Sequence, residues 1–574
     1  MGDDGSMKPY LNILAILAVA LAGCSDKPVA GVDTVFFNAT VYTVDSEQAW
    51  AEAIAVDGDS IVYVGDSESA LALAGDSTKR VDLDGKLVLP GFIDAHFHPL
   101  NGGAYVNALS LNTYGTPDEW VAAIAEYAEQ RPEQEILFGY GFLATTFGPA
   151  GPTRQQIDAV VADRPVLIVD EGFHGGWANS AALELLNITQ DTPDPEPGFS
   201  YYKRDASGDA TGYLLEGTAM LAMDALDVIG DDIVVAGTGD VIDIMNGYGI
   251  TAGFDAGGKL MADHTKNLLD RVAAAGELTL RLKGSVRARK EDSAETTIAR
   301  AVRRKSAVIG DNYHYDTLKI PNDGTVESRT AAMFEDYQGE PGNSGMTVFT
   351  EEELTELISA AAAQNIDVHV HSLGERAIHE TLNSIETTRA QIPDSQSRYA
   401  ITHIQAITDQ DVPRFGELDV IGQTTPLWAS YDTYGEQFVS DDQFQRFWRF
   451  KSIEDTDGML TFGSDYPATG AGTLGLSPLV QIEIGHTRQW AGQSEGEVQP
   501  LESERLSIAS LIRGYTLDAA YQLRMEDEIG SIEVGKKADI VVLEDNIFEI
   551  DPYAIHSTRI LQTYLGGEVV FAAE

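Results

Sequence analysis

Cysteine is almost absent from this chain of 574 residues, which contains only Cys24. A single cysteine cannot form a disulfide within one chain, and it cannot supply the thiolates of a structural zinc cluster. Any metal ion must therefore be held by nitrogen and oxygen ligands.

Positive charge is also scarce, because 38 Lys and Arg face 90 Asp and Glu, which gives a formal net charge of −52. Affinity for phosphate backbones comes from Lys and Arg that displace counterions, so nucleic acid is excluded as a partner. An anionic substrate would need a local site that is shielded from the acidic surface. The acidic residues are spread through the chain and form no tail, which indicates a hydrated folded surface.

No apolar run is long enough for a permanent membrane helix, which needs about 20 residues. The run Leu11–Ala22 follows Met7 and Lys8 and leads into Leu-Ala-Gly-Cys24, which resembles a bacterial lipoprotein signal. Residues 1–31 are therefore predicted to be a cloning remnant, a signal and a linker, with lipid attached at Cys24. The protein would be exported, to the periplasm or a membrane surface; the alternative is a buried helix with an incidental cysteine.

The remaining chain divides into two β-rich ends and a central α/β body. Residues 32–90 contain short alternating β-like runs separated by Asp-Gly and Gly-Asp turns, and similar runs return in residues 530–574. Between them, eight apolar runs are typical of buried strands: 88–98, 250–255, 280–286, 317–322, 366–371, 399–404, 421–426 and 459–465. Helical patterns separate several of these, most clearly 350–364, where Thr350 and Glu353 form a capping box.

Eight strand-helix units predict a (β/α)8 barrel over residues 91–529, at roughly 31 residues per unit. The first gap does not fit this spacing, because far more chain separates His98 from Ile250 than one unit requires. We therefore expect an insertion over about 99–245, and because loops that leave strand C-termini crown the active face of a barrel, it should roof the site.

Polar residues lie at the ends of several predicted strands. His96 and His98 alternate on one strand, so both imidazoles point the same way and can reach one metal ion. Further candidate ligands end later strands: Lys319, His371, His403 and Asp465. His369 shares a face with His371, so either of them could ligate. Plainer alternatives are an ion-paired Lys319 and a helix-capping Asp465.

These residues fall in stretches that resemble the amidohydrolase superfamily, specifically amidohydrolase family 3, which includes enzymes like N-substituted formamide deformylase. The likeness runs from about Val32 to Val570. The matching stretches are LPGFIDAHFHP (89–99), WANS (177–180), KIPNDG (319–324), HSLGERA (371–377), GSDYP (463–467) and GSIEVGKKAD (530–539).

The resemblance implies a distorted barrel with a composite β-sandwich formed by both termini. It also implies two divalent metal ions, expected to be zinc, one bound by His96 and His98 and the other by His371 and His403. Lys319, carboxylated by carbon dioxide to a carbamate, would bridge them, with Asp465 as a further ligand. Two departures from the family pattern are Glu375, where Asp is commoner, and Pro321, which could shift the bridge.

Two cations would lower the pKa of a water molecule toward neutrality, and the resulting hydroxide would attack a polarised carbonyl. Asp465 is the expected catalytic base, passing the proton to the leaving nitrogen. His174, Trp177 and Asn179 in the insertion are candidates for substrate binding, with a packed loop cluster as the alternative. The predicted reaction is hydrolysis of an amide-like, non-peptide carbon–nitrogen bond in a small acylated substrate.

Three other functions stay open at this stage. An esterase or lactonase would use the same chemistry, and a deaminase would use a Glu near the fifth-strand His as its proton carrier. A non-catalytic, ligand-binding surface lipoprotein would not need the base Asp465. The partner is expected to be a small molecule, with membrane contact only through a lipid anchor, and the oligomeric state is open between monomer and homodimer.

Overall fold

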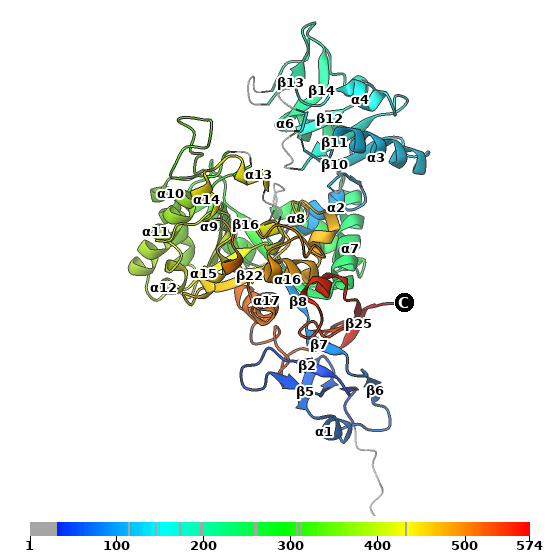
Figure 1. The fold of residues 1–574 in the computed structure, drawn as a ribbon, viewed down its shortest axis with the longest axis vertical. Helices are drawn as coiled ribbons and strands as arrows, with labels where there is room; N and C mark the ends of the chain where they lie inside the picture. The colour runs from blue at the N-terminus through cyan, green and yellow to red at the C-terminus, as the bar shows by residue number, and fades with distance from the viewer. Residues whose placement is uncertain are drawn as a thin grey trace, which may run out of the picture.

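The computed structural model describes residues 31–112, 115–143, 146–147, 150–171, 175–195, 200–257, 262–305, 308–309, 313–327, 329–430 and 433–574. Cys24 and His174 lie outside the described residues. Figure 1 shows three bodies along the long axis, with the barrel in the middle, an inserted sheet at one end and the terminal sheets at the other. None of the helices in the described ranges combines the length and apolarity needed to cross a bilayer.

Eight parallel strands form the central barrel, which confirms the predicted α/β barrel class. In sheet order they are β8 (Phe92–Phe97), β15 (Ile250–Asp255), β16 (Arg281–Arg287), β18 (Tyr313–Pro321), β19 (Asp367–Ser372), β20 (Tyr399–His403), β21 (Val420–Thr424) and β22 (Met459–Phe462). The first and last strands meet just beyond β22, where the Asp465 N–H donates to the His96 carbonyl at 2.7 Å. Pro321 is the last residue of β18, so it does not interrupt the strand.

The predicted first strand is in fact two strands. The apolar run 88–98 divides at Gly91 into β7 (Leu87–Pro90), which belongs to a terminal sheet, and β8 of the barrel. A Cβ at Gly91 would lie 2.2 Å from the Thr251 hydroxyl, so only glycine fits where the chain passes from one sheet to the next.

Helices cover the outside of the barrel and bury their apolar faces against the strands. The main ones are α7 (Asp231–Gly247), α8 (Ala262–Ala274), α9 (Ala294–Lys305), α10 (Glu351–Ala362), α11 (Glu375–Gln391) and α16 (Pro478–Thr487). The predicted capping box is confirmed, because the Thr350 side chain accepts from the Glu353 N–H ahead of α10. Leu354, Leu357 and Ile358 of this helix are buried in the largest hydrophobic cluster.

Strands from both ends of the chain pair with each other. A six-stranded sheet contains β3 (Trp50–Ala51), β2 (Thr40–Tyr42), β7, β23 (Ile540–Leu543), β24 (Ile560–Leu565) and β25 (Glu568–Ala572). A four-stranded sheet contains β5 (Ser60–Gly65), β4 (Ala53–Asp57), β1 (Thr34–Phe37) and β6 (Lys79–Asp82). Phe36 of the second sheet shares a hydrophobic cluster with Val88 and Ile540 of the first, so the termini are held together by hydrogen bonds and by burial.

The chain between β8 and β15 builds a separate six-stranded sheet. Its strands, in sheet order, are β13 (Tyr202–Arg204), β14 (Ala210–Leu215), β12 (Gly175–Ala178), β11 (Val166–Asp170), β10 (Leu137–Phe142) and β9 (Leu109–Ser110). Two hydrophobic clusters of its own stabilise it. Helix α2 (Pro99–Tyr105) contributes Leu100 to the barrel core and Tyr105 to a cluster of the inserted sheet, and α7 packs on the barrel core.

Candidate metal centre

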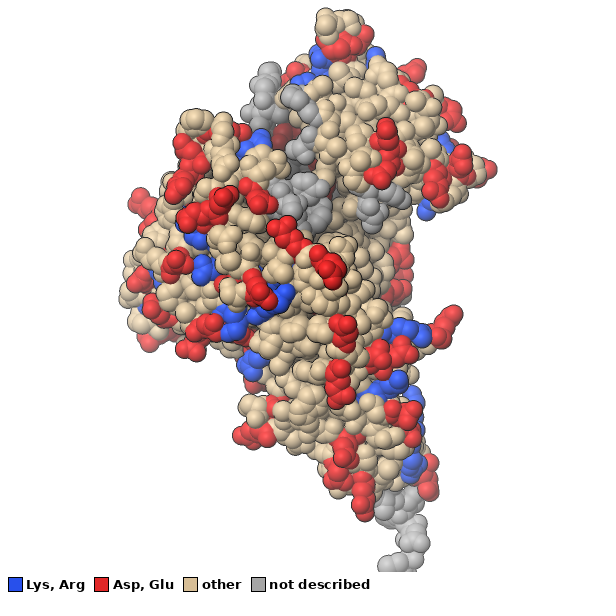
Figure 2. All heavy atoms as spheres, in the orientation of Figure 1, with Lys and Arg blue, Asp and Glu red and all other residues tan. Residues whose placement is uncertain are grey.

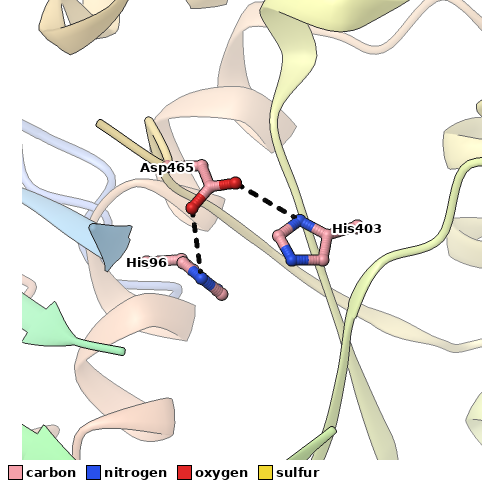
Figure 3. Close-up of side chains that lie close together, drawn as sticks. All are labelled: His96, His403 and Asp465. Carbon is pink, nitrogen blue, oxygen red and sulfur yellow. Dashed lines mark ion pairs between the residues drawn. The ribbon is translucent and has the colours of Figure 1, made fainter. Parts of the chain in front are cut away.

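Three buried side chains converge at the C-terminal rim of the barrel, which is the end from which the inserted sheet emerges (Figures 1 and 3). His96 comes from β8, His403 is the last residue of β20, and Asp465 follows β22. The Asp465 carboxylate lies between the two imidazoles, 3.4 Å from His96 Nε2 and 3.9 Å from His403 Nδ1. Ligand atoms bound to one small cation at 2.0–2.2 Å lie about 3–4 Å apart, so this spacing suits a metal ion.

The other predicted ligands surround these three. His98 Nε2 is 3.1 Å from the Asp465 carboxylate, and Lys319 Nζ is 3.4 Å from His96 Nε2. The rings of His371 and His403 are 4.5 Å apart, centroid to centroid. All six predicted ligands therefore lie at one site, although they come from five separate strands or strand ends.

The second ring nitrogen of His96 is held by the barrel interior. His96 Nδ1 lies 2.9 Å from His369 Nε2 and 2.9 Å from the Thr402 hydroxyl. Hydrogen bonds of this kind fix the ring orientation and leave Nε2 facing Asp465 and Lys319. Because its Nε2 is engaged with His96, His369 acts as a support at this position, and His371 is the better placed candidate ligand on β19.

Two of the converging residues have unusual backbone conformations. His403 and Asp465 have φ values of 80° and 54°, in the left-handed region that costs non-glycine residues on the order of 1–3 kcal/mol. Just before Asp465, a Cβ at Gly463 would lie 2.4 Å from the His96 backbone nitrogen. The Asp94 carboxylate accepts from the N–H groups of His96 and Ser464 at 3.1 and 3.0 Å. These contacts fix the Asp465 segment against β8.

Burial sets the charge state of the site. It lowers the pKa values of His96, His369 and His403 well below their usual range, and together with Lys319 it lowers the pKa of His371 to about 3. The imidazoles are therefore neutral and able to ligate. Burial also lowers the pKa of Lys319 to about 7, despite the nearby Asp465.

These donors fit a divalent cation. Neutral imidazoles, a carboxylate and a lysine with a depressed pKa are the nitrogen and oxygen groups that zinc and related metals bind. His403 Nδ1 is buried and has no hydrogen-bond partner among the described residues, as expected for a nitrogen that binds an ion.

Two acidic residues near the site have structural contacts. Asp323 accepts three backbone N–H bonds, from Ala332, Leu373 and Gly374, at 2.9–3.0 Å, and so ties the loop after β18 to the loop after β19. Glu375 is buried at the start of α11, and its carboxylate lies 2.7 Å from Arg446 Nη1. A carboxylate held in this ion pair is poorly placed to carry protons for a deaminase.

Two of the three residues predicted to contact the substrate from the insertion, Trp177 and Asn179, are buried in its packing. Trp177 is 0% exposed, its Nε1 donates to the Thr153 carbonyl at 2.8 Å, and its ring lies against Phe142 and Phe147. Asn179 is also fully buried, and its amide bonds four backbone groups around the start of α5 (Ser180–Leu185). In this structure both side chains stabilise the inserted sheet, which agrees with the packing alternative rather than with direct substrate contact.

Several site residues carry no signal that sequence reasoning detected. Thr402 contacts His96 from a strand distant in sequence, and Asp94 joins the N–H of His96 to that of the distant Ser464. Trp428, in the 3-10 helix η2 (Pro426–Ser430), places its ring 5.5 Å from that of His403, centroid to centroid. It lies in the loop after β21, so a search of the segments that follow barrel strands could have identified it.

Comparison with known proteins agrees with the fold. A model of the amidohydrolase family matches residues 79–571. The exoenzymes regulatory protein AepA of Pectobacterium carotovorum is 30% identical over 69% of this chain and 85% of its own length. N-substituted formamide deformylase of Arthrobacter pascens is 26% identical over 93% of this chain and 97% of its own. A metal-dependent hydrolase from Pyrococcus horikoshii shares the fold, with a TM-score of 0.71, 23% identity, and coverage of 90% of this chain and 99% of that one.

With six metal-competent side chains gathered at the barrel rim, this chain belongs to the amidohydrolase family and is a hydrolase of carbon–nitrogen bonds.

Proposed function

We propose that this amidohydrolase cleaves a non-peptide, amide-like carbon–nitrogen bond in a small acylated substrate. The observation that carries the proposal is the convergence of neutral imidazoles, a buried lysine and the Asp465 carboxylate at the barrel rim. The similarity to N-substituted formamide deformylase over nearly the whole chain supports a small N-acyl substrate.

We propose that the site holds two divalent ions, with zinc as the preferred metal. His96 and His98 would hold one ion, and His371 and His403 the other, with Asp465 as an additional ligand. Lys319 would lie between them as a carbamate formed with carbon dioxide; its low pKa favours the neutral amine that this reaction requires. When bound, such ions supply Lewis acidity toward a carbonyl oxygen and lower the pKa of a water molecule.

The protein's own groups move the proton. The Asp465 oxygens lie 3.1–3.9 Å from three imidazoles, so the carboxylate is held at the centre of the site. In our proposal it accepts the proton of the attacking water and donates it to the leaving nitrogen. Asp465 is 8% exposed, so little bulk water competes for this proton.

The test is a substrate panel that contrasts bond types on the same acyl group. We expect N-formyl and N-acetyl amines to be hydrolysed with a kcat/KM at least about tenfold higher than that of the matched formyl and acetyl esters. Hydrolysis is followed by release of the free amine or alcohol. Preference for esters or lactones would overturn the proposal, and release of ammonia from amino-purines or amino-pyrimidines would favour a deaminase.

We further propose that the two terminal sheets act as one composite β-sandwich and that the insertion covers the site. The hydrophobic cluster shared by the two sheets supports the first assignment. The second is supported by the origin of the insertion, which leaves the barrel at His98 and reaches the inserted sheet through α2.

We also propose that the chain is exported and is anchored to the membrane through a lipid on Cys24. The sequence of the first 24 residues supports this proposal. Expression of the full chain with a labelled fatty acid should label the wild-type protein, whereas Cys24→Ala should abolish the label and release the protein from membranes. Labelling that persists in Cys24→Ala would contradict the proposal.

A further inference from the structure

Arg287 is a basic residue at the site that the mechanism does not use. It is the last residue of β16, and its register partner on the neighbouring parallel strand is Lys319. Register partners of parallel strands project to the same face of the sheet, and Lys319 projects into the barrel toward His96. The Arg287 side chain therefore begins at the inner rim of the barrel. Its backbone lies one strand spacing, about 4.8 Å, from the backbone of Lys319.

Arg287 differs from the other basic side chains of β16, because no acidic group among the described residues pairs with it. On the same strand, Arg281 pairs with Asp539 at 2.8 Å and Lys283 pairs with Asp316 at 2.8 Å. Within the described ranges, no carboxylate pairs with Arg287; burial and then Arg289 lower its pKa, and no acidic group raises it. Its positive charge acts on the site, because it contributes to the lowered pKa values of Lys319 and His371.

That no acidic group in the described part of the chain pairs with Arg287 is notable in a protein with 90 acidic residues. Figure 2 shows carboxylates distributed over the whole visible face, with far fewer basic groups. A partly buried guanidinium without a partner is costly, and its planar fork suits a carboxylate bound through two hydrogen bonds. Such a group also provides a local positive field that attracts an anionic substrate, whereas the acidic surface repels it.

We propose that Arg287 binds a carboxylate of the substrate, so that the preferred substrates are N-acyl amino acids or related amides with a carboxylate beside the scissile bond. This inference rests on the proposed amide hydrolysis and specifies its substrate class. The short spacing between Arg287 and Lys319 places the carboxylate within a few bonds of the reacting carbon, and the leaving amine carries it.

The test uses two substrates that differ only in the carboxylate, N-acetylphenylalanine in both enantiomers and N-acetylphenethylamine. We expect the wild-type enzyme to prefer the carboxylated amide. Arg287→Met should lower the ratio of the two kcat/KM values by at least about 30-fold, mainly through KM. Arg287→Lys, which keeps the charge but loses the fork, should give an intermediate ratio. The matched control is Lys290→Met, an exposed position just beyond the strand, which should leave the ratio unchanged.

Binding is measured separately, so that this inference and the proposed function can fail independently. Calorimetric titration of N-acetylphenylalanine into the Asp465→Asn protein should show binding that Arg287→Met abolishes, whether or not turnover occurs. If Arg287→Met reduces both substrates equally and also lowers metal content, the residue stabilises the Lys319 region instead, and the inference is overturned. A wild-type preference for the neutral amide would also overturn the inference. If no amide is hydrolysed but N-acetylphenylalanine still binds, only the proposed function is contradicted.

Discussion

Asp465→Asn should lower kcat by about 10²–10⁴-fold while the metal content stays close to that of the wild type. The amide keeps an oxygen that can ligate and has nearly the shape of the carboxylate, but it cannot accept a proton. Asp465 lies beside His96, His98 and His403, so it is the carboxylate that reaches most of the site. Steady-state kinetics on the preferred amide, with elemental analysis of the same preparation, measures both quantities.

The matched control for this variant is Asp442→Asn, which removes the same charge from a carboxylate that is 92% exposed. It should keep wild-type kinetics. If Asp465→Asn retained full turnover, Asp465 would not be the base. If it lost its metal, the residue would act as a ligand first, and the rate could not report on proton transfer.

Removal of metal should lower activity by at least about 10³-fold, because carbonyl polarisation and water activation both depend on the ion. It should also lower the midpoint of thermal unfolding, since an ion that binds only the folded protein stabilises it. Dialysis against a chelator, followed by zinc with and without bicarbonate, measures the loss and the recovery. We expect full recovery to require both additions, because the proposed Lys319 carbamate needs carbon dioxide.

Two outcomes would contradict this expectation in different ways. Recovery with zinc alone in carbon dioxide-free buffer would contradict the proposed carbamate and indicate that Lys319 acts as an unmodified amine. Full activity of the chelated protein, with elemental analysis showing no metal, would contradict the proposal that hydrolysis depends on a metal ion. Recovery at one equivalent of zinc would reduce the proposed pair of ions to one.

The barrel strands could be predicted because local rules determine them. Buried parallel strands are short apolar runs, and their C-terminal ends meet at one rim, so His371, His403 and Asp465 fall together once the strand order is known. Alternation along β8 likewise places His96 and His98 on one face. Thr350 begins its helix through a cap that needs only four residues.

Features that depend on distant contacts could not be predicted in this way. The division of the run 88–98 at Gly91 depends on Thr251, and the packing of Trp177 depends on Phe142 and Phe147. The support that His369 and Thr402 give to His96 requires three strands in register. Arg287 lies in no motif, and the absence of a counterion for it among the described residues can be recognised only when its neighbours in space are known.

The passage from β7 to β8 through Gly91 has a consequence for biosynthesis. Strand β7 pairs on one side with β2, from the start of the chain, and on the other with β23, from near its end. The six-stranded sheet therefore cannot be completed until β23 has left the ribosome, and until then β7 has an open edge. Because β8 continues directly from β7, the strand that carries His96 gains its final anchor only after β23 has been synthesised.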